Sequence, residues 1–465
     1  METAYHLAVL GDHLGGLAAA ALAARRGERV LLLEHAASGP PLPFGLLNAV
    51  AGGPEHEPAL TRFFQALGLA PFGPLGDDRI HFHALSPPLQ VCLPRHRVSV
   101  HADRTARAWE LQREFGDAQR ALAPLVQQEE ELRGRAERAA PPPGVPVAPL
   151  PLRVLSGLSG LLRLQALERE AGRRGFAAYL DGCGIAGDLR AAVTAQVLAV
   201  RRRPAGALNW AEGLRALRVA GGGLYRNAAG QSGLLEGLRA VLLARGGDAR
   251  PLVALEGLDV TRAGGVRLHL SAGGTVRAGR VVVDLPLAEG LRLLPGESAR
   301  ALARKGIEER EEHAYGLLEF TLAAGRRPDE MGDYLVIDPG GEGVPGAAVL
   351  LAVAAAGDEG KGTCAAEALA MFPGGADDAA RARVLAAVRS VLPFFDESVA
   401  GPPVWRTGAA PRFTRERIDR GRREARLAAG WRTAVFCQPP FTFLRNEDYA
   451  ATPLAEALIS GALAI

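Results

Sequence analysis

The opening of the chain most restricts what it can fold into. Residues 7–10 form a short apolar run that ends at Gly11, and Gly15 and Gly16 then begin a helix rich in alanine and leucine. A second apolar run follows and ends at Glu34. This order of strand, tight turn, helix and strand is typical of a βαβ unit that binds a nucleotide, in which the terminal acid accepts the ribose hydroxyls.

One residue of the turn departs from the G-x-G-x-x-G pattern. The second glycine of that pattern lets a pyrophosphate approach the backbone at the positive end of the helix, and this chain has His13 there. An imidazole at that position must either turn away from the path of the phosphates or occupy it. The sequence therefore predicts the βαβ unit and leaves open whether a dinucleotide binds to it.

Length and composition set further limits. A chain of 465 residues exceeds the size at which a single core keeps growing, so at least two domains are expected. Acidic and basic residues nearly balance without a basic block, so nucleic acid is not an expected partner. The four cysteines are widely spaced, as in a reducing compartment. With no leader or membrane-spanning run, the expectation is a cytoplasmic protein that at most contacts a membrane surface.

Histidines gather in the segment that follows the opening unit. Residues 80–85 and 89–93 are predicted as short strands joined in a hairpin. His81 and His83 lie on one side of the first strand, and two more histidines follow within twenty residues. Because no Asp, Glu or Cys completes a ligand set in this pattern, no metal site is predicted.

The middle of the chain contains three contrasting segments. Residues 106–140 are predicted as a charged helix with an apolar stripe that includes Trp109, and residues 141–152 as a stiff, proline-rich linker. Residues 154–167 are apolar. They fit either a core helix or part of an apolar tunnel or membrane-facing lip.

A second glycine-rich region precedes the next set of elements. The sequence predicts an amphipathic helix over 233–244, a three-stranded meander with turns at glycine pairs, and an apolar strand over 280–284.

This order of elements resembles the FAD-dependent phytoene desaturase, retinol saturase and amine oxidase superfamily. The opening GGLAAAALAARRGERVLLLE is similar to the desaturase branch, and the strand VVVDLP and the closing segment also fit. The resemblance implies an α/β fold, in which a Rossmann-like FAD/NAD(P)-binding domain carries an inserted α+β substrate domain, mostly an antiparallel sheet plus helices. The implied dinucleotide-binding domain is discontinuous and consists of residues 1–70, 219–295 and 400–465, whereas residues 71–218 and 296–399 form the substrate domain. The resemblance also implies strands near 317–322, 334–337 and 347–353 in the sheet of the substrate domain, with a helix over 379–392 that covers them.

The resemblance also implies a set of cofactor contacts. Gly11, Gly15, Gly16 and Glu34 match the family, and Leu255 stands where the family has a valine whose backbone meets adenine. The complete set of positions implied to contact the cofactor is Gly11, His13, Leu14, Gly15, Gly16, Glu34, His35, Leu255, Cys437 and Gln438.

Several of these contacts depart from the family pattern. Besides His13, Pro40-Pro41 follow the second strand where the family has a G-G motif near a basic residue. Near the carboxyl end, Cys437 and Gln438 replace the Gly-Asp that binds the flavin side of the cofactor. The departures affect phosphate and flavin contacts, whereas the packing glycines are kept.

Two functions remain open from the sequence. The first is an FAD-dependent oxidoreductase of phytoene-desaturase or amine-oxidase type, acting on an apolar, isoprenoid-like substrate in a cleft lined by aliphatic side chains. The second is a degenerate, non-catalytic homologue that keeps the fold without flavin and serves as a binding or partner subunit, beside an intact paralogue. No catalytic residues are assigned, because flavin hydride chemistry is largely the cofactor's own. NAD in place of FAD is less favoured, since His13 would obstruct any pyrophosphate equally.

Overall fold

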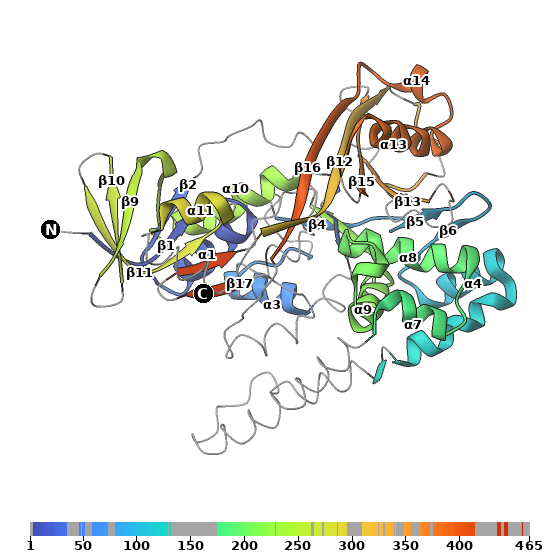
Figure 1. Ribbon diagram of the computed structural model, residues 1–465, viewed down its shortest axis with the longest axis horizontal. Coiled ribbons are helices and arrows are strands. Elements are labelled where there is room, and N and C mark those ends of the chain that lie inside the picture. The colour runs from blue at the N-terminus through green and yellow to red at the C-terminus, as the bar shows by residue number, and fades with distance from the viewer. Residues whose placement is uncertain are drawn as a thin grey trace.

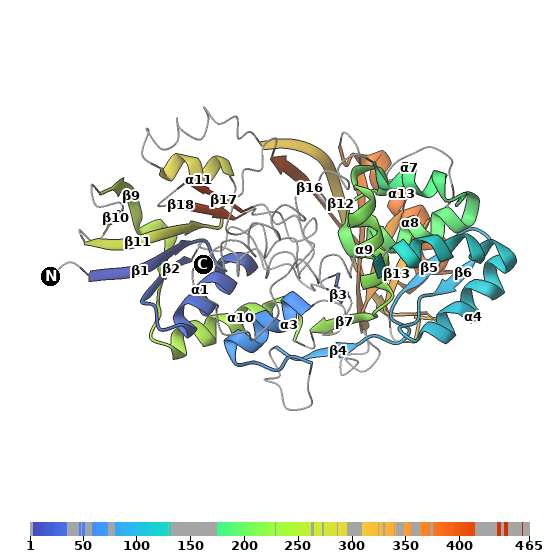
Figure 2. The same ribbon diagram turned by 90° about the horizontal axis from the view of Figure 1, so that it is seen from below.

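The chain is described by a computed structural model that contains three β-sheets with helices on their faces. The described residues, apart from single residues and pairs inside these ranges, are 3–34, 46–51, 58–72, 80–131, 174–261, 265–294, 309–340, 348–354, 363–413, 435–444 and 458. Figures 1 and 2 show the two larger sheets toward opposite ends of the long axis, with a small sheet between them.

The first sheet has eight strands, of which β18, β11, β1, β2 and β8 are neighbours and all parallel. Its strands are β1 (Thr3–Leu10), β2 (Val30–Glu34), β8 (Asp248–Pro251), β9 (Leu255–Val260), β10 (Val266–Leu270), β11 (Thr275–Val283), β17 (Val435–Gln438) and β18 (Phe441–Leu444). Val9 lies opposite Val282 on one side and Leu32 on the other. The predicted meander is confirmed, since β9, β10 and β11 pair antiparallel. The carboxyl ends of β1, β2 and β11 therefore meet at one edge.

Helices cover one face of the first sheet. α1 (Leu14–Arg25) is buried from its first residue to Ala24 and packs on β1, β2 and α10 (Gly230–Ala244). Its alanines and glycines let the helix approach both a sheet and another helix closely. α3 (Pro58–Leu67) also contacts α1, and α10 begins three residues earlier than the prediction of 233–244. α11 (Leu287–Leu293) follows β11, and η3 (Leu252–Ala254) links β8 to β9.

The second sheet has seven strands in the order β16-β12-β15-β14-β13-β5-β6. These strands are β5 (Gln90–Cys92), β6 (Arg97–Ser99), β12 (Glu309–Ala323), β13 (Tyr334–Ile337), β14 (Val349–Val353), β15 (Thr363–Phe372) and β16 (Val404–Phe413). The strands predicted near 317–322, 334–337 and 347–353 are present, and the predicted covering helix is α13 (Asp378–Val391), followed by α14 (Phe395–Ser398). We call the face turned away from α13 the inner face.

A helical layer packs on the inner face. Its members are α4 (Arg104–Phe115), η1 (Gly116–Leu122), α7 (Phe176–Gly182), α8 (Gly187–Arg201), η2 (Ala205–Ala207) and α9 (Trp210–Ala220). One continuous set of buried side chains runs from α1 through α8 and α9 to Tyr334 and Leu369 of the second sheet. The two larger sheets thus share a core.

The predicted hairpin over 80–85 and 89–93 is wrong. β4 (Phe82–Ala84) joins a third sheet with β7 (Leu224–Asn227) and β3 (Ala49–Ala51), whereas β5 belongs to the second sheet. Phe82 packs against the ring of Phe64 from α3, while all three residues of β5 are buried within the second sheet. Tertiary packing therefore separates two strands that are adjacent in sequence.

Two other expectations also need correction or remain untested. Trp109 is 73% exposed, so it does not belong to an apolar stripe, and the helix predicted over 106–140 is broken at Gly116, where α4 has ended and η1 begins. The predicted linker at 141–152 and the apolar segment at 154–167 lie outside the described residues. The domain boundaries stay a prediction, although β16, within the predicted segment 400–465, pairs with β12 of the second sheet.

Candidate functional site

The turn between β1 and α1 brings three chain segments into close contact. Gly11 has φ +101°, and a side chain on it would collide with the backbone carbonyl of Asp284. The Asp284 N–H donates to the carbonyl oxygen of Leu10 at 2.7 Å, and the Gly11 N–H donates to Leu33 at 2.9 Å. Glycine is required here both for its backbone conformation and for this close approach.

The side chain of Asp284 lies beneath the beginning of α1. Its Oδ2 accepts a hydrogen bond from the Gly16 N–H at 2.5 Å, and the residue is only 2% exposed. Gly16 is the third residue of α1, so Asp284 satisfies one of the N–H groups that a helix leaves unpaired at its start. The sequence prediction missed this contact, although an acid directly after the apolar run VVV was a visible signal.

The imidazole of His13 does not cap this helix end. His13 is the N-cap residue of α1 with an extended backbone (φ −68°, ψ 174°), its side chain makes no capping hydrogen bond, and the residue is exposed. Among the described residues, none accepts a hydrogen bond from the backbone N–H groups of Leu14 and Gly15. Two N–H groups at a positive helix end form the usual geometry for binding a phosphate.

The charge of Asp284 depends on opposing influences. Burial raises the pKa of the Asp284 carboxyl, while the nearby His13 and the hydrogen bond from Gly16 lower it, and Asp12 raises it again. Burial is the largest of these influences, so the neutral carboxyl persists to higher pH than in an exposed aspartate.

Glu34 lies at the same edge, at the end of β2. Its carboxylate pairs with the guanidinium of Arg239 from α10, at 2.5 Å between Oε1 and Nε. The hydrogen bond with Glu34 stabilises the protonated guanidinium of Arg239 and so raises the pKa of Arg239. A carboxylate has about four acceptor positions, so Glu34 keeps the capacity to accept ribose hydroxyls as well.

Some of the remaining predicted cofactor positions are described by the structure, and others are not. Leu255 begins β9 shortly after β8, which runs parallel to β2, and it belongs to the same buried cluster as Leu31 and Leu33. The residues of the implied set and motif that lie outside the described residues are His35, Pro40 and Pro41.

Cys437 and Gln438 lie away from the edge at which the carboxyl ends of β1, β2 and β11 meet. β17 runs antiparallel to β18, and Gln438 is opposite Phe441, the first residue of β18. Because β18 is parallel to β11, Gln438 aligns with Val281, before the carboxyl end of β11. The register therefore turns the carboxyl end of β18, instead of Cys437 and Gln438, toward Asp284.

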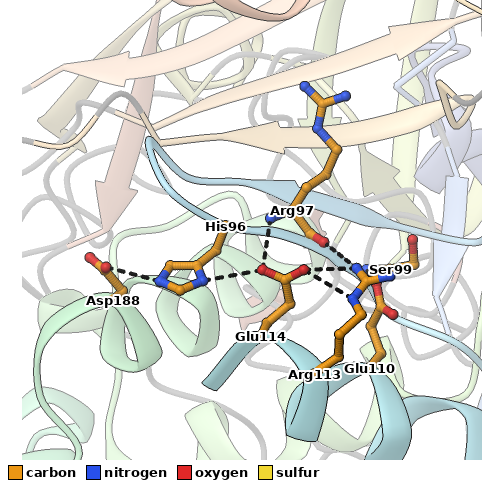
Figure 3. Close-up of polar contacts among 7 residues, drawn as sticks. All are labelled: His96, Arg97, Ser99, Glu110, Arg113, Glu114 and Asp188. Carbon is orange, nitrogen blue, oxygen red and sulfur yellow. Dashed lines mark hydrogen bonds and ion pairs between the residues drawn. The ribbon is translucent and has the colours of Figure 1, made fainter. Parts of the chain in front are cut away.

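A cluster around His96 is the most connected polar group in the helical layer (Figure 3). The Nδ1 atom lies 3.1 Å from Glu114 of α4, and Nε2 lies 3.2 Å from Asp188 of α8. Because these carboxylates contact opposite nitrogens, they cannot converge on one metal ion, and no group of three suitable ligands occurs among the described residues. The cluster joins α4, α8 and the turn between β5 and β6.

The inner face of the second sheet carries two buried acids. Glu319 on β12 lies directly opposite Glu367 on β15, and they are 3% and 0% exposed. We call these residues the acidic pair. Glu319 pairs with Arg406 at 2.6 Å, and Glu367 accepts the Leu47 N–H at 3.0 Å.

A buried arginine accompanies the acidic pair. Arg226 of β7 is 6% exposed and donates to the carbonyl oxygens of Val353 and Asp333, at 2.9 and 3.1 Å. Burial lowers the pKa of Arg226, and the charges of Asp333 and Glu367 oppose this effect. The inner face near β12 and β15 is thus partly polar.

Comparison with known proteins relates the chain to others by fold. No family model and no curated protein sequence matches it. Solved structures do match at low identity. A fatty acid isomerase from P. acnes, described as producing CLA, has a TM-score of 0.57 at 14% identity over 99% of this chain and 97% of the other.

Two further structures have different names. A cofactor-binding variant of putrescine oxidase has a TM-score of 0.57 at 13% identity, over 99% of this chain and 98% of the other. A Rab GDI from Plasmodium falciparum has a TM-score of 0.51 at 9% identity, over 90% and 92%. At these identities the likeness concerns the fold. Within the described residues, none of the helices is both long and apolar enough to cross a membrane. The chain has the fold shared by this oxidase, this isomerase and this GDI.

Proposed function

We propose that the protein is an FAD-dependent oxidoreductase that acts on an apolar small molecule, with an isoprenoid-like compound as one candidate. The observation that supports it best is the start of α1, where the Leu14 and Gly15 N–H groups lack a described partner and His13 is exposed. This arrangement supports the proposal, because the imidazole makes no capping hydrogen bond to the helix end.

The described residues fit the adenosine and pyrophosphate half of the cofactor. The N–H groups of Leu14 and Gly15 would bind phosphate oxygens, and Glu34 would accept ribose hydroxyls beside Arg239. Leu255 would lie near the adenine. Bound FAD would supply the hydride chemistry, and this chain's residues would hold and orient it.

The apolar substrate is supported by fold analogy to a fatty acid isomerase, which is an associational argument. The acidic pair and Arg226 mark the limit of this argument, because a ligand that reaches β12 and β15 would meet carboxylates there. The proposed substrate is apolar along its length and does not reach these two strands. Contact with a membrane surface and an intact paralogue as partner stay secondary proposals.

A second candidate function is a non-catalytic binding or partner subunit that keeps the fold without flavin. The observation that favours it is the carboxyl group of Asp284 on the Gly16 N–H, which places an acid beside the expected path of the phosphates. A Rab GDI among the similar folds agrees with a use of this fold outside the proteins named oxidases.

The test is a titration of the purified protein with FAD, followed by flavin fluorescence. The first function predicts saturable binding at micromolar or tighter concentration and an absorbance band near about 450 nm. His13→Gly should change the affinity by no more than about 1.5–3 kcal/mol, the value of one charge-assisted hydrogen bond. Absence of binding by both proteins would favour the non-catalytic function.

A pair of variants at Leu14 isolates the pyrophosphate contact. Proline is tolerated at the first helical position and removes its N–H, and the extended backbone of His13 suits a following proline. Leu14→Ala loses the same buried side chain but keeps the N–H. If the helix end binds FAD, Leu14→Pro should bind about tenfold more weakly than Leu14→Ala. Equal affinities would show that FAD binds elsewhere.

A further inference from the structure

His96 links two helices of the helical layer to the turn between β5 and β6. Its Nδ1 lies 3.1 Å from Oε2 of Glu114 in the last turn of α4, and its Nε2 lies 3.2 Å from Oδ2 of Asp188 in the first turn of α8 (Figure 3). A neutral imidazole has one N–H donor and one acceptor, whereas the imidazolium has two donors. Both carboxylates therefore receive a hydrogen bond only from the protonated ring.

The attachment of α4 depends on polar contacts of this kind. All twelve residues of α4 are described and none of them is buried, although Leu111 and Phe115 pack partly against the core. At the beginning of the helix, Arg107 donates to the carbonyl oxygens of His101 and Gly221, at 3.0 and 2.6 Å. Arginine stays protonated in proteins, so this end of α4 is held at any working pH. The other end is the one that His96 contacts.

Further charged groups lie beside the link. Glu114 also accepts the backbone N–H of Arg97 at 3.3 Å and pairs with Arg113 at 2.8 Å, and Arg113 in turn pairs with Glu110 at 2.8 Å. The charged groups around the imidazole are therefore Glu110, Arg113 and Glu114 of α4, Asp188 of α8 and Arg97 of β6. Carboxylic acids ordinarily ionise below about pH 5 and arginine stays charged, so the imidazole is the group of this network whose charge changes near neutral pH.

We propose that His96 is a proton-dependent latch, which holds the last turn of α4 to α8 when its imidazole is charged and releases that turn when the imidazole is neutral. The neutral ring keeps a single N–H, so one of the two carboxylates then faces a nitrogen lone pair. The latch is closed at low pH and opens as pH rises through the range in which histidines lose their proton, between about pH 5 and 8. It operates whether or not a dinucleotide binds at α1.

Hydrogen exchange of the backbone amides tests the latch, because it reads the two ends of α4 separately. Wild type is labelled at about pH 5.5 and about pH 8, with labelling times scaled to the intrinsic exchange rate. Protection of residues 111–116 should fall about two- to fivefold at the higher pH, the range expected for partly exposed ion pairs. Protection of residues 107–109 should not change, because Arg107 holds that end.

Two variants and a matched control make the test specific. His96→Gln keeps an amide donor but cannot change its charge, so it should abolish the pH response of residues 111–116. Asp188→Asn removes one acceptor charge from a side chain that is 49% exposed, and it should reduce the response without unfolding the protein. The control is His269→Gln on β10, where His269 contacts the carboxylate of Asp259 at 2.8 Å. It should keep the response of wild type.

Several results would overturn the inference. Equal protection of residues 111–116 at both pH values in wild type would make His96 a purely structural bridge. A response that survives in His96→Gln would assign the pH dependence to another group. If His96→Gln does not fold, the comparison of wild type with Asp188→Asn decides, because an undiminished response in Asp188→Asn contradicts the latch.

Discussion

The molecule buries acids in two regions and compensates them differently. Asp284, at the edge formed by the carboxyl ends of β1, β2 and β11, accepts a hydrogen bond from a backbone N–H and lies near the exposed His13. The acidic pair of the second sheet instead lies among arginines, with Arg406 bonded to Glu319 and Arg226 near Glu367. A full cation stabilises a buried carboxylate more strongly than the partial charge of a backbone N–H. The arginines of the second region should therefore contribute more to stability than the turn contacts of the first.

The largest effect is expected from Arg226→Met. Methionine has a similar length but leaves the carbonyls of Val353 and Asp333 without the Arg226 donor and removes the guanidinium that acts on Asp333 and Glu367. Loss of one member of a buried charged group costs about 3–5 kcal/mol of unfolding free energy. Urea denaturation measures it, with Arg245→Met on the exposed end of α10 as control. A loss below about 1 kcal/mol would mean that the second region is not held by its arginine.

A smaller effect is expected from Gly16→Ala in the first region. A methyl group there would lie 2.6 Å from the Gly11 carbonyl oxygen and 2.7 Å from Oδ2 of Asp284. Overpacking of this kind costs about 1–3 kcal/mol. The matched control is Gly257→Ala on β9, where nothing lies within 4 Å. If both variants unfold at the same denaturant concentration, the packing around Gly16 accommodates a methyl group more easily than its geometry indicates.

Glu319→Gln should have a smaller cost still. Its partner Arg406 is about one-third exposed, so the guanidinium can turn toward water when the charge is removed. The other oxygen of Glu319, Oε1, has no hydrogen-bond partner in the described structure. We expect a loss of about 1–2 kcal/mol, near the value of a single charged hydrogen bond. A loss as large as that of Arg226→Met would show that the two acids act as one unit.

The smallest effect on stability is expected from Arg239→Gln. Arg239 is 45% exposed and Glu34 25% exposed in their pair. Such surface pairs contribute about 0–1 kcal/mol, and less at high salt. Thermal unfolding at low and high ionic strength would measure this. A loss that salt does not reduce would mean that the pair is part of the fixed framework.

The βαβ opening was predictable because its signals are local. Apolar runs, a glycine turn and an alanine-rich helix lie within about thirty residues, and each corresponds to one element, β1, α1 and β2. The same reasoning failed for residues 80–93, because β4 and β5 are divided between sheets by partners from β7 and β13, more than a hundred residues away. Period and propensity do not specify such partners.

The site was only partly predictable for a related reason. Gly11, Gly16 and Glu34 follow from the motif, and the structure brings them to one edge. The exposure of His13 and the contact of Asp284 with Gly16 depend on how β11 lies beside β1, which spans 268 positions of sequence for that hydrogen bond. The positions of Cys437 and Gln438 likewise depend on the register of β17 against β18, which pattern matching could not supply.

The strand order of the first sheet has a consequence for synthesis on the ribosome. β1 is made well before its neighbour β11, which comes at residues 275–283, and β18 at 441–444 pairs with β11 from the other side. The nascent β1 can pair with β2, but its other edge must wait for most of the chain. Such long-range pairing slows folding and exposes intermediates to aggregation. We expect the isolated amino-terminal unit to require a chaperone until the last strands emerge.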